Sequence, residues 1–533
     1  MNCVQALSMM AVGVDARKLD RDLQALEISD TQWKPVRLPE FRGSRNQRFN
    51  RSTLVENMTV DGWSIASQSR KAPFRGVLLI ATATATELAE RLRKVLHAAE
   101  EGHAPQPAAL AESQLHVPER MAIDYGNPTE LAERSAKALK ALDANDPMMW
   151  KALRAQGIFR GSGLAPKVAF LYPGQGSQYL NMLRPLSAAE PIVANTFAEA
   201  DSIMAPLLGK PLSEFFFVDD TDPSALGRAE KDLLRTEITQ PAVLTANVAL
   251  TRLLAAYGIV PDFTVGHSLG EYGALVVAGA LSFSDALQIV SLQTPELREL
   301  AIRGSGKMAA ILAPLEHVKH VLRSARGYVV IANINSNHQA VIGGASGAVQ
   351  KAIDLFLQAG YDAVPLPVTH AFHTALVNSL RQPLRATLQR IRLTPPRVPT
   401  VASVDGLFYP TGSDASLRMI DILERHVASP VEFVKSLHTL YAAGARVFVE
   451  VGPKRALQGF ADDVLGQRPD VVSLFVNHPK LGDFVSFNHA LCGLYAAGLG
   501  STKVEGVRPQ AVQTPPPVVE AAAEIAAGCS AAP

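Results

Sequence analysis

Cysteine is scarce in this chain, and the few that occur lie far apart. Three are present among 533 residues: Cys3, Cys492 and Cys529. They form neither a disulfide framework nor the paired spacing of a zinc site, and such sparse usage is typical of proteins in the reducing cytosol. We therefore expect a cytoplasmic protein with no metal site and no disulfide-stapled fold.

Long apolar runs and an excess of one charge are also missing. No run approaches the roughly 18 residues of a membrane span, and the segment after Met1 lacks the pattern of a secretory signal. Lys and Arg number 51 against 50 Asp and Glu, so no overall field favours nucleic acid or a membrane as partner. Apolar residues make up 47%, enough for a large core and too many for a disordered chain.

The length favours two to four domains of roughly 100–200 residues each. Residues 1–75 are predicted to form an irregular segment, basic and proline-containing in its second half, which we interpret as a solvated connector. Residues 76–160 hold two similar strand–helix patterns, the first with a helix capped by Thr86, and predict a small α+β subdomain. Residues 501–533 are rich in Pro and Ala without periodicity, which predicts a flexible tail.

Between these segments, residues 165–500 show strand and helix patterns that alternate with short turns. Such alternation is typical of a mainly parallel α/β sheet. Inside it, residues 307–372 follow the order strand, helix, strand, strand, helix, strand, which predicts an inserted ferredoxin-like subdomain. The fold class we expect is therefore α/β.

Ser268 occupies the centre of a Gly-x-Ser-x-Gly pattern, Val265-Gly-His-Ser-Leu-Gly270. An apolar, strand-like run over 259–265 precedes it, and a helical run over 271–279 follows. This context favours a nucleophile elbow, where small neighbours permit a tight turn and the helix N-terminus stabilises developing negative charge. The elbow indicates a large subdomain similar to an α/β-hydrolase.

Five motifs occur in the order found in one family. They are Pro173-Gly-Gln-Gly-Ser-Gln178, Gly266-His-Ser-Leu-Gly270, Ala332-Asn-Ile-Asn-Ser-Asn-His-Gln339, His370-Ala-Phe-His373 and Glu450-Val-Gly-Pro453. On these residues the chain resembles the acyltransferase domains of type I polyketide and polyunsaturated fatty acid synthases, and the malonyl-CoA:acyl-carrier-protein transacylases. Residues 76–154 also resemble the linker subdomain that precedes such domains after a ketosynthase.

The resemblance implies an enzyme that moves an acyl group from coenzyme A, through a serine ester, to the phosphopantetheine thiol of an acyl carrier protein. The reaction would belong to polyketide or fatty acid biosynthesis. It implies a ketosynthase and other modules of a synthase as further partners, and no bound cofactor.

The same resemblance assigns roles to individual residues. Ser268 would attack the thioester, and His373 would take and return its proton. The main-chain carbonyl of His426 would hold His373, so the side-chain type at 426 would matter little. The main-chain N–H groups of Gln175 and Leu269 would form the oxyanion hole.

Four further residues are assigned to the substrate pocket: Gln293, Asn335, His370 and Phe372. From the residues alone, His370 and His267 are more typical of packed structural histidines. Asn335 could equally be a plain turn residue, and the turn at 450–453 is interpreted as structural.

Gln293 is the point at which the chain departs from the family pattern. Malonyl-type members carry an Arg there, 25 residues after the serine, which pairs with the malonyl carboxylate. By contrast, His370-Ala-Phe-His373 is the form of the motif that the family uses with malonyl, where the residue at Phe372 narrows the pocket against branched extender units. The acyl group therefore stays open between a malonyl type and a small neutral unit such as acetyl, with Arg298 or Arg303 as possible substitutes for the missing charge.

Two alternative functions also stay open. The same serine could release acyl groups to water, as an editing thioesterase. The domain could also be a catalytically impaired scaffold, an interpretation that the missing Arg and the lack of an upstream ketosynthase cysteine motif allow.

Overall fold

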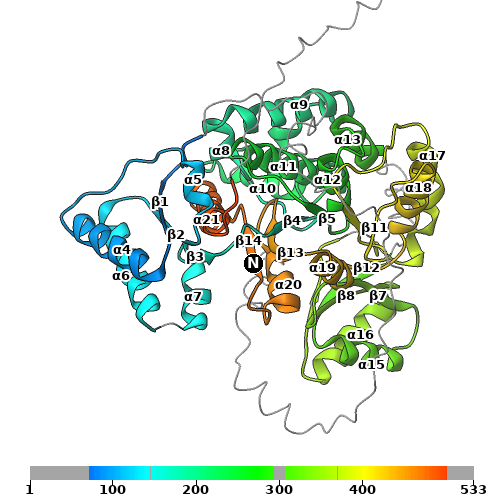
Figure 1. The fold of residues 1–533 in the computed structure, drawn as a ribbon. Coiled ribbons are helices and arrows are strands. Elements are labelled where there is room, and N and C mark those ends of the chain that lie inside the picture. Colours follow the sequence, from blue (N-terminus) through cyan, green and yellow to red (C-terminus); the bar gives the residue numbers. More distant parts are fainter. Residues whose placement is uncertain (1–70, 145, 293–305, 369, 501–533) are drawn as a thin grey trace, which may run out of the picture.

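The computed structural model describes residues 71–144, 146–292, 306–368 and 370–500 (Figure 1). The predicted tail at 501–533 and most of the predicted N-terminal connector lie outside this range. Figure 1 shows a small sheet with two helices on one side, a central α/β body, and a further lobe that contains β7 and β8.

The first subdomain is a three-stranded antiparallel sheet in the order β1-β2-β3. Its strands are β1 (Gly76–Thr82), β2 (Glu119–Tyr125) and β3 (Ile158–Ser162), and its helices are α4 (Ala85–Glu100), α5 (Glu112–Leu115), α6 (Pro128–Ala144) and α7 (Pro147–Arg154). Helix α4 begins two residues earlier than a cap at Thr86 would place it, because Thr84 is the cap: its side chain accepts a hydrogen bond from the N–H of Glu87.

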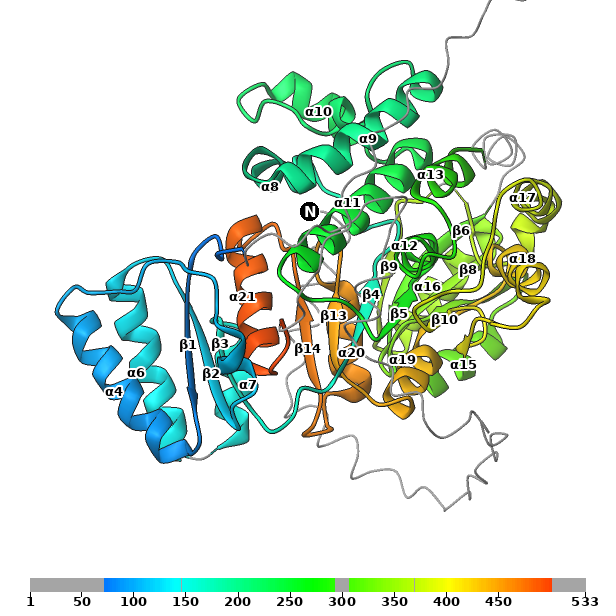
Figure 2. The same ribbon diagram turned by 45° about the horizontal axis from the view of Figure 1, so that its top comes forward.

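A helix from the far end of the chain covers the other side of this sheet. Helix α21 (Asp483–Ala496) packs on β1, β2 and β3 and also on the central sheet (Figure 2). The sequence did not predict this packing. It joins the α+β subdomain to the central body through one shared helix.

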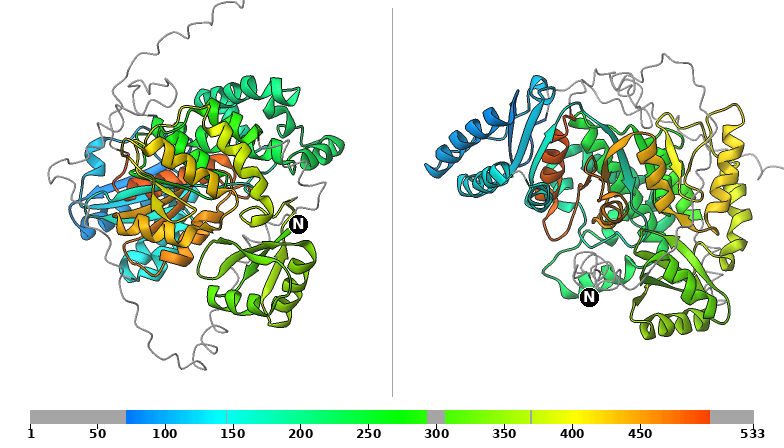
Figure 3. Two further views of the ribbon diagram at one scale, coloured as in Figure 1. Left: turned by 90° about the vertical axis from the view of Figure 1, so that its right-hand side faces the viewer. Right: turned by 60° about the horizontal axis from the view of Figure 1, so that its bottom comes forward.

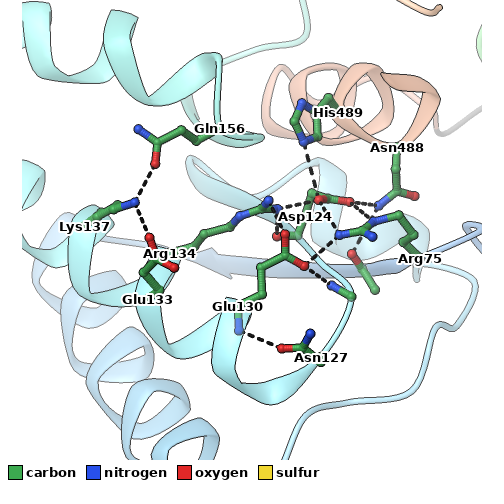
Figure 4. Close-up of polar contacts among 12 residues, drawn as sticks. Arg75, Asp124, Asn127, Glu130, Glu133, Arg134, Lys137, Gln156, Asn488 and His489 are labelled. Carbon is green, nitrogen blue, oxygen red and sulfur yellow. Dashed lines mark hydrogen bonds and ion pairs between the residues drawn. The ribbon is translucent and has the colours of Figure 1, made fainter. Parts of the chain in front are cut away.

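Asp124 holds that junction together. It is fully buried, and its carboxylate accepts hydrogen bonds from Arg75, from Arg134 and, at 2.6 Å, from the side-chain amide of Asn488 (Figure 4). His489 Nε2 lies 3.4 Å from the same carboxylate. Burial by itself would raise the pKa of Asp124, but the nearby His489 and the hydrogen bonds from Arg75 outweigh it and hold that pKa well below its usual range.

The central sheet has six strands in the order β11-β10-β5-β4-β13-β14, all parallel except β11. They are β4 (Lys167–Tyr172), β5 (Phe263–Gly266), β10 (Thr400–Ala402), β11 (Leu407–Phe408), β13 (Ala445–Glu450) and β14 (Val472–Phe475). Strand β5 starts four residues later than the apolar run suggested, because Pro261 has no N–H to give to a ladder.

Both faces of this sheet are buried, as parallel sheets require. Along β4, Val168, Phe170 and Tyr172 join one core, and Ala169 and Leu171 join the other. Helices α11 (Thr236–Ala256) and α12 (Gly270–Val277) cover the first face, and α19 (Phe433–Ala442) and α20 (Ala456–Leu465) the second. The other helices of the body are α8 (Arg184–Ala189), α9 (Pro191–Leu208), α10 (Pro223–Asp232), α13 (Phe283–Leu292), α17 (Arg381–Leu388), α18 (Ala415–His426), and the 3-10 turns η1 (Leu212–Phe215) and η2 (Ala375–Leu380).

The insert is a separate lobe (Figure 3) with the strand–helix order that the sequence predicted. Its elements are β6 (Lys307–Leu312), α15 (Leu315–Ser324), β7 (Val329–Ile334), β8 (Gln339–Gly344), α16 (Ser346–Gln358) and β9 (Asp362–Pro365), with the antiparallel order β7-β8-β6-β9. A short strand from the body, β12 (Val431–Glu432), pairs in parallel with β7 and was not predicted. The two subdomains thus share a sheet edge.

The α/β fold class expected from the sequence is confirmed by this arrangement and by the structural relatives reported below. In the part of the chain that the structure describes, no helix is long and apolar enough to cross a membrane.

Replacing Asp124 by Ala removes the buried acceptor that Arg75, Arg134 and Asn488 share, and leaves the two guanidinium groups with Glu130 as their common carboxylate. We expect Asp124→Ala to lower the free energy of unfolding by about 3 kcal/mol, measured by urea denaturation. The matched control is Glu133→Ala, which removes an exposed carboxylate that pairs with Lys137 at 2.5 Å and should have no measurable effect. Equal effects of the two variants would contradict this account of the junction.

Candidate active site

Ser268 lies in the turn between β5 and α12, with a φ of 55°. This left-handed backbone is strained for a serine, and such strain is a feature of nucleophile elbows. The flanking glycines have no room for a side chain: a Cβ would lie 2.0 Å from the N of Glu271 if placed on Gly266, and 1.9 Å from the O of Tyr172 if placed on Gly270. The Gly-x-Ser-x-Gly spacing is therefore a steric requirement of this turn.

His373 faces the serine from the segment that follows the insert. Its Nε2 lies 2.7 Å from Ser268 Oγ, while its Nδ1 lies 3.0 Å from the carbonyl oxygen of His426 and 3.1 Å from that of Ser429. A carbonyl oxygen can only accept, so the proton sits on Nδ1 and Nε2 is free to accept the serine proton. Burial and then the neighbouring His426 lower the pKa of His373 to about 3, which keeps the ring neutral near pH 7.

The C-terminus of α18 supplies these acceptors. The last carbonyls of a helix have no partner within the helix, and His373 uses two of them: its main-chain N–H donates to Val427 O at 3.1 Å, and its Nδ1 to His426 O. The negative end of the helix dipole also favours an imidazolium at this point.

The loop after β4 comes close to the elbow at Gly174, where a Cβ would lie 2.5 Å from His267 O and 3.2 Å from Leu269 N. In the described ranges, the N–H groups of Gln175 and Leu269 donate to no protein acceptor. Asn247 holds the loop, because its side-chain amide donates to Pro173 O at 3.0 Å. Two unused N–H groups on facing loops are suited to bind a carbonyl oxygen as it gains negative charge.

Glu271, on the first turn of α12, is a site residue that the sequence reasoning missed. Its buried carboxylate accepts hydrogen bonds from the N–H of Ser403 at 3.1 Å, from the Ser403 hydroxyl, and from the Tyr409 hydroxyl at 2.5 Å. Burial raises the pKa of Glu271 to about 7. A lone carboxylate in the apolar run that follows the elbow was the available signal.

The side chain of His426 belongs to the same network. Since the Ser403 hydroxyl donates to Glu271, its oxygen accepts from His426 Nε2–H, at 3.1 Å. Burial lowers the pKa of His426 to about 4, so this ring too is neutral. The expectation that only the backbone of His426 matters therefore overlooked a side chain that anchors the carbonyl facing His373.

Three of the four residues predicted to shape the pocket lie in the described part of the chain, and each has its own surroundings. Asn335 is buried, and its Oδ1 lies 2.7 Å from His267 Nε2, so it braces the residue before the serine. His370 is buried, with its ring 5.6 Å from that of Phe372, which packs against the cores of both the body and the insert. Gln293 lies outside the described residues, as do Arg298 and Arg303.

Among the described residues, no group of three or more His, Cys, Asp or Glu side chains is arranged to hold a metal ion. The chemistry that the arrangement itself can support is proton transfer and nucleophilic attack by a serine beside two backbone N–H donors.

Residues 169–489 match the family described as the acyl transferase domain. The chain belongs to this family. An acyltransferase of the α/β class, predicted from the motifs, is thereby confirmed.

Individual relatives agree with the family match. The chain is 35% identical over 303 residues to the malonyl CoA-acyl carrier protein transacylase of Bacillus subtilis, covering 56% of this chain and 90% of that protein. It is 32% identical over 315 residues to the spectinabilin polyketide synthase system protein NorB of Streptomyces orinoci, covering 59% of this chain but only 14% of that much longer protein. The crystal structure of the acyltransferase domain from the second module of the salinomycin polyketide synthase aligns with a TM-score of 0.58 and 28% identity, covering 80% of this chain and 93% of the other.

The Glu271 network can be tested by comparing two substitutions. Glu271→Ala leaves three donors without an acceptor, at about 1–3 kcal/mol for each buried group. We expect a loss of about 3 kcal/mol or more in the free energy of unfolding, with a lower thermal midpoint. Glu271→Gln keeps an acceptor oxygen and the same volume, and should lose clearly less; a Gln variant as unstable as the Ala variant would argue against the hydrogen bonds as the source of the effect.

Proposed function

We propose that this chain transfers an acyl group from coenzyme A to the phosphopantetheine thiol of an acyl carrier protein, with Ser268 as the nucleophile and His373 as the general base and acid. The observation that carries the proposal is the 2.7 Å contact of Ser268 Oγ with His373 Nε2, made while Nδ1 donates to backbone carbonyls.

The first half-reaction forms the serine ester. Ser268 Oγ attacks the thioester carbonyl as its proton passes to His373 Nε2. The N–H groups of Gln175 and Leu269 stabilise the oxyanion. The C–S bond then breaks, and the thiolate of coenzyme A takes the proton from His373. A carrier-protein thiol reverses these steps and leaves with the acyl group.

The substrate and partners are inferred from two kinds of support. Relatives named as malonyl CoA-acyl carrier protein transacylase and as part of a polyketide synthase system point to an acyl-CoA donor and a carrier-protein acceptor. Asn335, His370 and Phe372 shape the acyl pocket, and Gln293 occupies the position that determines how a charged acyl group is bound.

Residues 76–160 act as a linker subdomain beside a ketosynthase and other modules of a synthase. A cytoplasmic setting is part of the proposal, supported by the few, widely spaced cysteines.

The acyl-enzyme can be observed directly. Malonyl-, methylmalonyl- and acetyl-CoA are incubated separately with the protein, and the intact mass is measured. We expect an adduct of one acyl group with at least one donor, none in Ser268→Ala, and a strongly slowed reaction in His373→Ala, by about 100-fold or more.

The acceptor distinguishes transfer from hydrolysis. Release of coenzyme A that requires holo-carrier protein supports transfer, and release of equal rate without it supports a thioesterase. No adduct with any of the three donors would contradict both and favour an impaired scaffold.

The neutral residue at 293 gives a separate prediction. A guanidinium pairs with a carboxylate through two charge-assisted hydrogen bonds, which an amide cannot match. We expect Gln293→Arg to raise malonyl transfer relative to acetyl transfer by about tenfold or more, measured as the ratio of the two kcat/KM values. Gln293→Lys is the control, since it restores charge without the two-pronged geometry and should raise the ratio less. A ratio that both substitutions leave unchanged would show that this position does not contact the acyl carboxylate.

A further inference from the structure

A buried lysine contacts the loop that carries Gln175. Lys454 is only 8% exposed, has a left-handed φ of 69°, and donates from Nζ to the carbonyl oxygen of Gly176 at 3.0 Å. Burial lowers the pKa of Lys454 to about 8, and the ammonium group stays charged near pH 7. The reaction as proposed makes no use of this charge.

Three more basic side chains, those of Arg455, His478 and Lys480, lie in the same two loops, which follow β13 and β14. The guanidinium of Arg455 lies over the ring of Phe475 at 5.6 Å, and the Phe475 ring is 5.8 Å from that of His478. His478 is 9% exposed, and in the described ranges its Nδ1 has no hydrogen-bond partner. Burial and then the charges of Arg455, Lys480 and Lys454 lower the pKa of His478 to about 4. We refer to Lys454, Arg455, His478 and Lys480 as the cationic edge.

Among the described residues, no carboxylate pairs with the charges of this edge. Within the part of the chain described, none of Lys454, Arg455 and Lys480 forms an ion pair with a carboxylate. Burial raises the pKa of Glu450 to about 8, although the nearby charge of Arg455 acts in the opposite direction. The Glu450 carboxyl accepts a hydrogen bond from the N–H of Gln458 in α20. Like charges held together without an anion destabilise one another, so the arrangement is suited to an anion from outside the chain.

The cationic edge and the nucleophile lie at the same end of the central sheet. Strands β5, β4, β13 and β14 are neighbours and parallel, as Figures 1 and 2 show, so their carboxyl ends meet on one side of the sheet. The residues just beyond them are Ser268, Gln175, Lys454 and His478 in turn. With strands about 4.8 Å apart, the edge begins two strand spacings from the nucleophile strand, about 10 Å, and extends to a third.

We propose that the cationic edge binds the phosphate at the far end of the pantetheine arm while the thioester lies at Ser268. This inference rests on the proposed function. Coenzyme A and carrier-bound phosphopantetheine both carry a phosphate separated from the sulfur by that flexible arm, so the shared ligand chemistry is a phosphate ester. Lysine and arginine are the side chains that bind such groups through charge-assisted hydrogen bonds.

The test compares donors with and without phosphate. The double variant Arg455→Gln, Lys480→Gln removes two charges and leaves in place Lys454, which donates to Gly176 in the loop of Gln175. Its KM is measured with an acyl-CoA and with the matching acyl-pantetheine, which has the same thioester but no phosphate. We expect the KM for acyl-CoA to rise about tenfold or more, far beyond any change for acyl-pantetheine. The matched control is Lys319→Gln, Arg323→Gln on α15 of the insert, which should not change the ratio of the two KM values.

The acceptor separates the two sources of phosphate. Transfer to holo-carrier protein is compared with transfer to free pantetheine, using an acyl-pantetheine donor. A selective loss with acyl-CoA alone assigns the edge to coenzyme A, and a selective loss with holo-carrier protein alone assigns it to the carrier arm; both losses assign it to both. Equal changes with and without phosphate, or no change in either, would overturn the proposal. A wild type that transfers from acyl-pantetheine keeps the proposed function intact whatever the variant does, and thermal midpoints of all variants check folding.

Discussion

The hydrogen bond from His373 Nδ1 to the carbonyl oxygen of His426 determines what the serine beside it can do. A carbonyl accepts but carries no full charge, so it fixes the tautomer without supplying a carboxylate to offset an imidazolium. The low pKa of His373, about 3, agrees with this. His373 is therefore a weak base whose imidazolium gives its proton up readily, and this suits exchange between thioesters, where the leaving group departs as a thiolate.

Because the acceptor is backbone, its position depends on whatever holds the end of α18. The ring of His426 and the hydroxyl of Ser403 connect that end to Glu271, three residues after Ser268 on the nucleophile helix. Strand β12, which begins two residues after Ser429, pairs with β7 and fixes the same segment to the insert. Ser268, His373 and the carbonyl groups that face His373 thus come from three separate stretches of chain. Contacts with both the body and the insert keep these stretches in place.

Local patterns predicted the local features of the site. The glycines around Ser268 reflect a turn whose sterics depend on neighbours in sequence, so the elbow could be predicted from a few residues. The insert was predicted for the same reason, from its strand–helix order. Glu271, Ser403 and Tyr409 come together only through the tertiary fold, as do Asp124 and Asn488, and no period or spacing encodes such contacts. Strand β12 is two residues long, too short for any pattern of alternation.

The distribution of charge around the nucleophile suggests how binding and selectivity are divided. The oxyanion donors are neutral N–H groups, and the position that would receive an acyl carboxylate, Gln293, is neutral as well. One positive charge of the cationic edge does reach the oxyanion loop, because Lys454 Nζ donates to the carbonyl oxygen of Gly176, and we have proposed that the phosphate of the arm binds there. Electrostatic attraction then acts mainly on the part of the substrate that every acyl-CoA shares. Interactions common to all substrates raise affinity without discriminating between acyl groups. Under the proposed function, discrimination would therefore depend on the shape of the pocket around Phe372 and on hydrogen bonds.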